Sequence, residues 1–190
     1  MMCVSAIRYS TFLKSQAARL ACDRTGAMQS LEFAMVGPIF IGLLLSLFEM
    51  GILMAKIAML DHAVAGASKF VYIGAAQGGA ISQADIGTFI CEKSVLFRDC
   101  EENITVELKP IADFSSSPDE DAECIDSNDD DALAPVVDYQ TGVGSEVMFM
   151  RVCITTDVVT PGMGLGLFLK TPDTDRAQII SSTAFMNEPF

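Results

Sequence analysis

The chain has 190 residues, of which 51% are hydrophobic and 19% charged, and its formal net charge is −13. This length fits one domain or a small domain with an appendage, and the composition is too apolar for an ordinary soluble protein. A strongly acidic chain without a basic stripe also excludes a nucleic-acid partner, because it would repel phosphate groups.

The apolar excess is concentrated between residues 33 and 55, where Glu49 is the only charged side chain. As a helix this run reaches ~34 Å, enough to cross a hydrocarbon core of ~30 Å, whereas the uncharged part up to Phe48 reaches only ~24 Å. We therefore expect a transmembrane helix over residues 32–56, anchored in a lipid bilayer. The rival interpretation is a secretory signal cleaved after Ala65, but the run is longer and begins later than the apolar core of a signal peptide.

Charges on the two sides of this run differ in sign. Residues 1–31 contain four basic side chains and one acid, whereas residues 61–190 contain seven basic and 22 acidic side chains. Because basic residues beside a span stay in the cytoplasm, the leader at 1–31 is predicted to be cytoplasmic and the C-terminal part to be exported.

Four of the six cysteines lie in the exported part, where disulfides are permitted: Cys91, Cys100, Cys124 and Cys153. We expect bridges Cys91–Cys100 and Cys124–Cys153, since the first pair is close along the chain and the second would tie an acidic loop to a strand. Four cysteines allow three connectivities, so the sequence alone does not select this one.

The exported part is predicted to have an α+β fold. Apolar residues at helical spacing extend the membrane helix into a stalk over residues 57–79, ending at "AAQGG". A domain at 80–190 should then contain one helix, at residues 83–97 and capped by Ser82 with Asp85, packed on an antiparallel sheet. Alternating apolar residues predict strands at 103–109, 146–156 and 178–187.

An acidic loop is expected at residues 112–135. Asp126, Asn128 and Asp130 occupy the first three ligand positions of an EF-hand loop, but the sixth position is Asp131 and the twelfth is Val137. A solvated loop is therefore favoured over a calcium site, and no metal or cofactor is expected.

Catalytic motifs are missing from the sequence. The single histidine, His62, lies beside the membrane span, "GMGLG" at 162–166 is interpreted as a turn, and no nucleophile motif or phosphate-binding loop is present. We therefore predict that the protein is not an enzyme and that its partners are proteins or the membrane.

Three residues in the span form a helical stripe: Gly42, Ser46 and Glu49. A partner helix can approach the two small residues closely and satisfy the carboxylate of Glu49. The alternative is that Glu49 extends alone toward the exported interface, joined by Lys56.

The stretch "RTGAMQSLEFAMVGPIFIGLLLSLFEMG" at residues 24–51 resembles the N-terminal signature of the TadE-like proteins of the tight-adherence (Flp) pilus system. The residues that carry the resemblance are Gly26, Glu32, Phe33, Ala34, Val36, Pro38, Glu49 and Gly51. The end of the chain, with Glu188 and Pro189, is similar to the closing strand of the family.

The resemblance implies a single-pass protein of the bacterial inner membrane, a minor pilin or pseudopilin that supports biogenesis of an adhesive pilus. Its partners would be other pilin-like subunits, pilus-assembly membrane proteins and a prepilin-type peptidase. Glu32 would pair with the α-amino group of a neighbouring subunit, in keeping with the cost of an unpaired carboxylate in lipid.

The processing site departs from the pilin pattern. Pilins have four residues between the glycine and the glutamate, whereas here five residues separate Gly26 from Glu32. Cleavage therefore falls after Ala27, leaving Met28 as the first residue, or the site is not used.

The runner-up function is a membrane-tethered exported binding module whose acidic loop captures a cation or a basic ligand.

Overall fold

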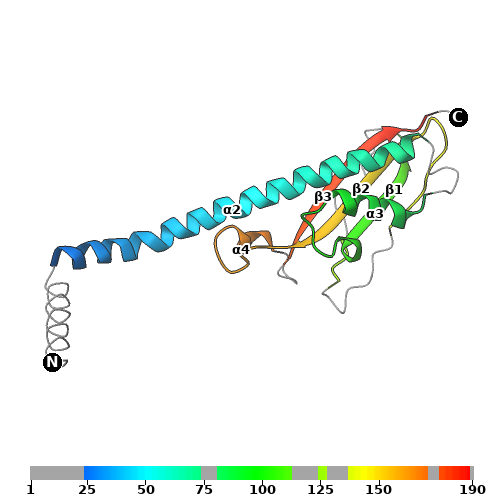
Figure 1. The fold of residues 1–190 in the computed structure, drawn as a ribbon. Coiled ribbons are helices and arrows are strands. Elements are labelled where there is room, and N and C mark those ends of the chain that lie inside the picture. The colour runs from blue at the N-terminus through cyan, green and yellow to red at the C-terminus, as the bar shows by residue number, and fades with distance from the viewer. Residues whose placement is uncertain (1–23, 74–80, 113–123, 128–136, 171–175, 189–190) are drawn as a thin grey trace, which may run out of the picture. The chain divides into compact units, whose positions relative to one another are not determined.

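The computed structural model describes residues 24–73, 81–112, 124–127, 137–170 and 176–188, with side chains from residue 28 onward. The elements within these ranges are α2 (Arg24–Tyr72), α3 (Gln83–Lys93), the 3-10 helix η1 (Cys100–Glu102), β1 (Ile104–Ile111), β2 (Val147–Asp157), α4 (Gly166–Leu169) and β3 (Arg176–Met186) (Figure 1). This is the predicted α+β fold, in which a long apolar helix is followed by a small domain with an antiparallel sheet.

The chain forms two compact units, Met1–Leu44 and Leu45–Phe190. The described part of the first unit is the beginning of α2, whose large apolar side chains are exposed, among them Phe33, Phe40 and Leu43. A helix that is apolar on all sides requires an apolar environment around it, either lipid or other protein.

The second unit is built on a three-stranded antiparallel sheet in the order β1-β2-β3. The register places Leu108 opposite Met150 and Arg151 opposite Ser182. Tyr139 extends the edge of the sheet, because it forms an isolated parallel bridge to Leu108. Each predicted strand is present, with boundaries shifted by one or two residues.

One hydrophobic core joins the sheet to α2 and α3, which lie across it (Figure 1). The strands present alternate residues to this core because successive side chains of a strand point to opposite faces. The fully buried large residues of the core come from both helices and from the two strands β1 and β2: Leu60, Val64, Val71, Ile86, Ile90, Leu108, Met148, Met150, Val152 and Ile154.

Helix α3 begins where its capping residues predict. The Asp85 amide donates to the Ser82 hydroxyl at 3.3 Å, and the Ser82 amide donates to the Asp85 carboxylate at 2.8 Å. These hydrogen bonds from the backbone and side chain of Ser82 lower the pKa of Asp85. The helix ends at Lys93 rather than at residue 97, and the Ser94 amide donates to the Cys91 carbonyl beyond that end.

Residues 57–72 are helical, as predicted for the stalk, and they continue α2 without a break. Their apolar stripe also belongs to the core of the folded unit, where it packs together with α3 and the sheet. The predicted end of the stalk at 75–79 lies outside the described residues.

Candidate functional site

Glu32 lies near the start of α2, in the first compact unit. Glu32 is exposed, and so are its apolar neighbours Leu31 and Phe33. Of the expected processing residues, Gly26 and Ala27 lie in the first turns of α2, and Met28 is exposed. The pairing role of Glu32 and the processing site stay predictions.

By length and composition α2 is a candidate membrane span. The segment Met28–Tyr72 contains a window with a mean hydropathy of 2.1, and only 6% of that window is buried. The core helix of a soluble protein would be mostly buried. The exposure of this strongly apolar surface therefore favours a membrane environment around the helix.

Glu49 is buried, with a relative exposure of 5%. Its Oε1 accepts a hydrogen bond from the Val159 amide at 3.0 Å. Its Oε2 accepts from both the amide and the hydroxyl of Thr160, each at 3.0 Å. A buried carboxylate is stable only when its oxygens are satisfied in this way.

Ser46 makes a related contact one turn earlier on α2, where its hydroxyl accepts from the Leu165 amide at 3.2 Å. Glu49 and Ser46 therefore bind one segment of their own chain, which follows β2 and includes α4 (Figure 1). Glu49 therefore does not extend alone toward water in this structure, and the approach of a partner helix to its stripe stays a prediction.

Gly42, the third member of the predicted stripe, lies in the other compact unit. A Cβ atom on Gly42 would meet no heavy atom within 4 Å. Close approach of a second helix at Gly42 stays a prediction.

The segment bound by Glu49 depends on two glycines for its path. Gly164 has φ +60°, a left-handed conformation that costs glycine little. A Cβ atom on Gly166 would overlap the Thr160 carbonyl. Internal hydrogen bonds run from the Met163 amide to the Thr160 carbonyl and from the Phe168 amide to the Leu165 carbonyl.

Lys56 lies two turns beyond Glu49 on α2. Its Nζ donates to the Thr156 hydroxyl at 2.7 Å and to the Asp157 carbonyl at 3.3 Å. Lys56 thus binds the last residues of β2, and Glu49 binds residues just beyond them.

Both expected disulfides are formed in the structure. The Cα atoms are 5.7 Å apart in Cys91–Cys100 and 5.4 Å apart in Cys124–Cys153. The first bridge connects α3 to η1. The second connects the described part of the acidic loop, residues 124–127, to β2.

Asp126 of the acidic loop is bound to a buried arginine. Arg176 Nη1 lies 2.6 Å from Asp126 Oδ1, and it also donates to Asn103 Oδ1 at 2.8 Å. The first ligand position of the candidate calcium loop is therefore occupied by an internal ion pair. Asn128, Asp130 and Asp131 lie outside the described residues, and among the residues described no cluster of three or more His, Cys, Asp and Glu side chains is placed to hold a metal ion.

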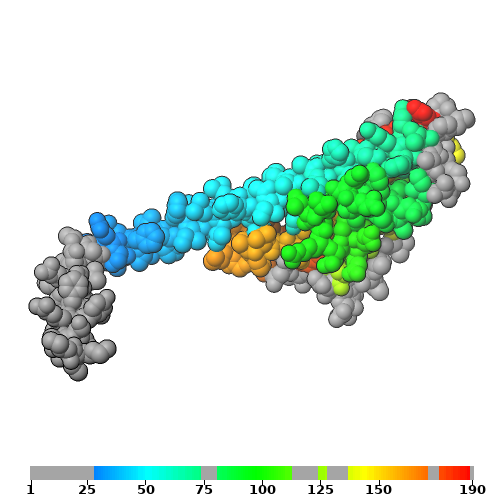
Figure 2. All heavy atoms as spheres, in the orientation of Figure 1, coloured from blue at the N-terminus to red at the C-terminus, as the bar shows by residue number. Residues whose placement is uncertain are grey.

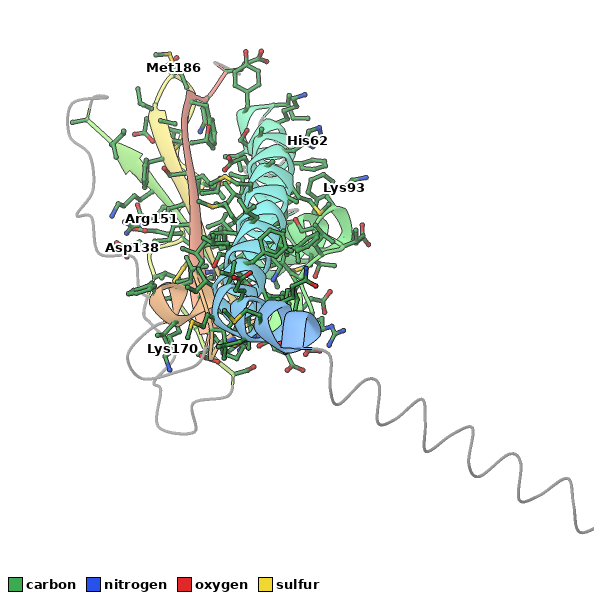
Figure 3. All side chains as sticks on the ribbon, turned by 90° about the vertical axis from the view of Figure 1, so that its left-hand side faces the viewer. His62, Lys93, Asp138, Arg151, Lys170 and Met186 are labelled. Carbon is green, nitrogen blue, oxygen red and sulfur yellow. A yellow bond between two sulfur atoms is a disulfide. The ribbon has the colours of Figure 1, made fainter. Side chains whose placement is uncertain are left out.

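A second charged group, centred on Glu107, lies on the face of the sheet away from the hydrophobic core. Figure 3 shows Arg151 on the side away from α2, whereas His62 projects from α2 away from the sheet. Arg151 and Lys109 lie 2.6 Å and 2.7 Å from the Glu107 carboxylate. Burial alone would raise the pKa of Glu107, but hydrogen bonds and charges from Lys109 and Arg151 outweigh it and lower the pKa.

The partner of Glu49 was not predicted from the sequence. Residues 162–166 were interpreted as a simple turn, although residues 158–169 form a run without any charged side chain between Asp157 and Lys170. An uncharged run of this length after a strand of an acidic domain is the sequence feature that could have indicated this contact.

Comparison with protein families gives a match to the model of the TadE-like protein family over residues 28–68. No curated protein and no solved structure matches the chain. The matched residues include Glu32, Ser46 and Glu49 and extend into the part of α2 that packs on the sheet. The resemblance to the TadE-like family that the N-terminal motif predicts is thereby confirmed over residues 28–68.

Proposed function

We propose that this protein is a membrane-anchored minor pilin or pseudopilin that supports assembly of an adhesive Flp-type pilus. The observation that carries the proposal is the TadE-like match over residues 28–68, since it covers the apolar segment of α2 together with Glu32 and Glu49. The role is structural rather than catalytic. It requires insertion into a membrane, export of the folded unit and contact with other subunits.

The membrane role is supported by the surface of α2. Between residues 28 and 44 its large apolar side chains are exposed, with Phe33 at 73%. In water this surface would be costly, because each buried apolar side chain contributes about 1.5–3 kcal/mol. In the proposed topology the leader at 1–31 is cytoplasmic, residues 32–56 span the inner membrane, and the folded unit is periplasmic or extracellular.

Export is supported by the two disulfides, because such bridges persist in oxidising compartments and are rare in the cytosol. Reporter fusions test this topology directly. A periplasm-active reporter after Phe190 should be active, and the same reporter at Ser15 should be silent. The reverse result would refute both the orientation and the compartment assigned to the cysteines.

Assembly is proposed to depend on Glu32. In a bilayer its carboxylate requires a partner, and the α-amino group of a processed neighbouring subunit supplies one. After processing by a prepilin-type peptidase, the intact mass should lack residues 1–26 or 1–27. An uncleaved mass in a host with an active peptidase would refute this maturation.

The decisive experiment is genetic. Deletion of the chain should reduce pilus number and surface adherence, and the wild-type chain should restore both. Glu32→Ala should fail to restore adherence while accumulating normally in the membrane fraction. Full adherence without the chain would refute the proposed function.

A further inference from the structure

Residues 158–169 form a segment without a charged side chain in an otherwise acidic unit. Several of its apolar side chains are exposed, led by Phe168 at 83%, with Met163 and Leu167 about half exposed. Figure 2 shows the segment in orange against the cyan part of α2. Soluble monomers rarely expose contiguous apolar groups of this kind without a partner.

The hydrogen bonds of the segment fix its position along the axis of α2. Val159 and Thr160 bind Glu49, and Leu165 binds Ser46. Both acceptors lie within the apolar run at residues 33–55. Wherever that run enters a bilayer, the segment is carried to the same depth.

Five backbone amides of the segment have hydrogen-bond acceptors within the protein. Irregular backbone at membrane depth is tolerated only when its polar groups are satisfied by protein. Here the amides of Val159 and Thr160 donate to Glu49, and those of Leu165, Met163 and Phe168 donate to Ser46 or to carbonyls within the segment. Glu49 therefore supplies acceptors that water would supply elsewhere.

A polar boundary lies just beyond the segment. Lys56 is about 10 Å further along α2 than Glu49 at ~1.5 Å per residue. It binds Thr156 and the carbonyl of Asp157, the last residue of β2. A groove beside this contact is also lined by Arg98. Basic side chains at this level suit the headgroup region, where long cationic side chains reach phosphates.

We infer that residues 158–169 dip into the outer leaflet of the membrane that α2 crosses, placing Met163, Leu167 and Phe168 among the acyl chains of that leaflet. The inference rests on the membrane anchoring given under the proposed function. It adds a second membrane contact, which holds the folded unit close against the bilayer, and it assigns Glu49 as the residue that positions this contact.

The chain contains no tryptophan, so the fluorescence of a single introduced tryptophan reports only on the surroundings of that position. Full-length protein carrying Phe168→Trp is reconstituted in vesicles of phosphatidylethanolamine and phosphatidylglycerol, with and without lipids brominated at different depths of the acyl chains. We expect a blue-shifted emission maximum and strong loss of intensity with brominated lipid.

Two matched variants complete the experiment. Val143→Trp places the probe at an exposed apolar position, 62% exposed, that precedes the opposite end of β2, and it should show no quenching. Phe40→Trp lies in the apolar run of the first unit and should be quenched by bromines deeper in the acyl chains. Adding Glu49→Ala to Phe168→Trp should reduce the quenching of that probe.

The outcomes distinguish the membrane anchor from the second membrane contact. Quenching of Phe40→Trp without quenching of Phe168→Trp overturns the second contact and leaves the anchor intact. Blue-shifted but unquenched emission from Phe168→Trp also overturns it, because the segment is then covered by protein. Absence of quenching at Phe40→Trp refutes the anchor itself, and the second contact with it.

Discussion

Two parts of α2 are similarly apolar but differ in their surroundings. Between residues 28 and 44 the large side chains are exposed on every side of the helix, whereas between residues 57 and 72 the buried residues form one stripe against the sheet. The difference lies in the pattern rather than in the amount of apolar residues. An apolar stripe specifies a protein core, and an apolar helix without polar sides specifies an apolar solvent.

The two glutamates of α2 also differ in their surroundings. Glu32 is exposed, and Glu49 is enclosed by three donors of its own chain. Both belong to the motif that resembles the TadE-like signature. In the proposed function Glu32 is kept for a partner outside the chain, whereas Glu49 binds the segment that follows β2 in its own chain.

The largest expected effect tests the contrast between the two parts of α2 by the same substitution in each. Leu60→Ala, at a fully buried residue, should destabilise the folded unit by about 2–5 kcal/mol. Leu43→Ala, at an exposed residue, should change stability by less than about 0.5 kcal/mol. Urea unfolding of the full-length chain in detergent micelles, followed by near-ultraviolet circular dichroism, measures both. Equal effects would show that the two parts do not differ in packing.

The next effect compares the carboxylates. Glu49→Ala leaves the amides of Val159 and Thr160 without their acceptor and should cost about 1–3 kcal/mol in the same unfolding measurement. Glu32→Ala should leave the unfolding midpoint unchanged while impairing assembly. A stable Glu49→Ala protein with normal Phe168→Trp quenching would refute the positioning role of Glu49.

A smaller effect isolates one of the donors to Glu49. Thr160→Val keeps the shape of the side chain and removes the hydroxyl that donates to Oε2, while the Thr160 amide keeps its own bond. We expect a loss of about 1 kcal/mol, since the remaining donors still satisfy the carboxylate. Thr141→Val, at a half-buried threonine outside this contact, is the matched control and should have a smaller effect. A neutral Thr160→Val would show that the two amides alone hold Glu49.

Sequence patterns predicted the elements of the folded unit because each has a local signal. The alternation at residues 146–156 identified β2, and Ser82 with Asp85 identified the start of α3. The placement of cysteines on these elements favoured the observed disulfide pairing but did not select it, because four cysteines allow three connectivities. Residues 57–72 were predicted to be helical. Their packing on the sheet depends on contacts with strands far along the chain, and an apolar stripe does not indicate which element it will pack against.

The contacts of Glu49 could not be derived from spacing. Its donors lie 110 and 111 residues away, and the motif around it suggests a partner in a neighbouring helix just as well. The interpretation of "GMGLG" as a turn agrees with the structure but does not include its surroundings, because the apolar residues of this turn come to lie beside α2 only when the chain is folded. Arg176 was likewise missed as the partner of Asp126, since the pairing joins a loop to a distant strand.

The smallest expected effect contrasts Glu49, whose donors are neutral groups, with Glu107, whose partners are the cations Lys109 and Arg151. The pKa of Glu107 is lowered from its ordinary value of 4.5, so its ion pairs stabilise the folded state above that pH. Stability from this group should decline as the pH falls below about 4.5 toward the lowered folded-state pKa, because the unfolded chain then binds the proton first. Urea midpoints of the wild type and of Glu107→Gln, measured from neutral to acidic pH, should therefore converge at low pH and separate above it. Added salt should narrow the separation, since charges at a partly exposed site are screened. A Glu107→Gln midpoint that runs parallel to the wild type at every pH would show that the ion pairs on this face contribute nothing to the acid sensitivity of the folded unit.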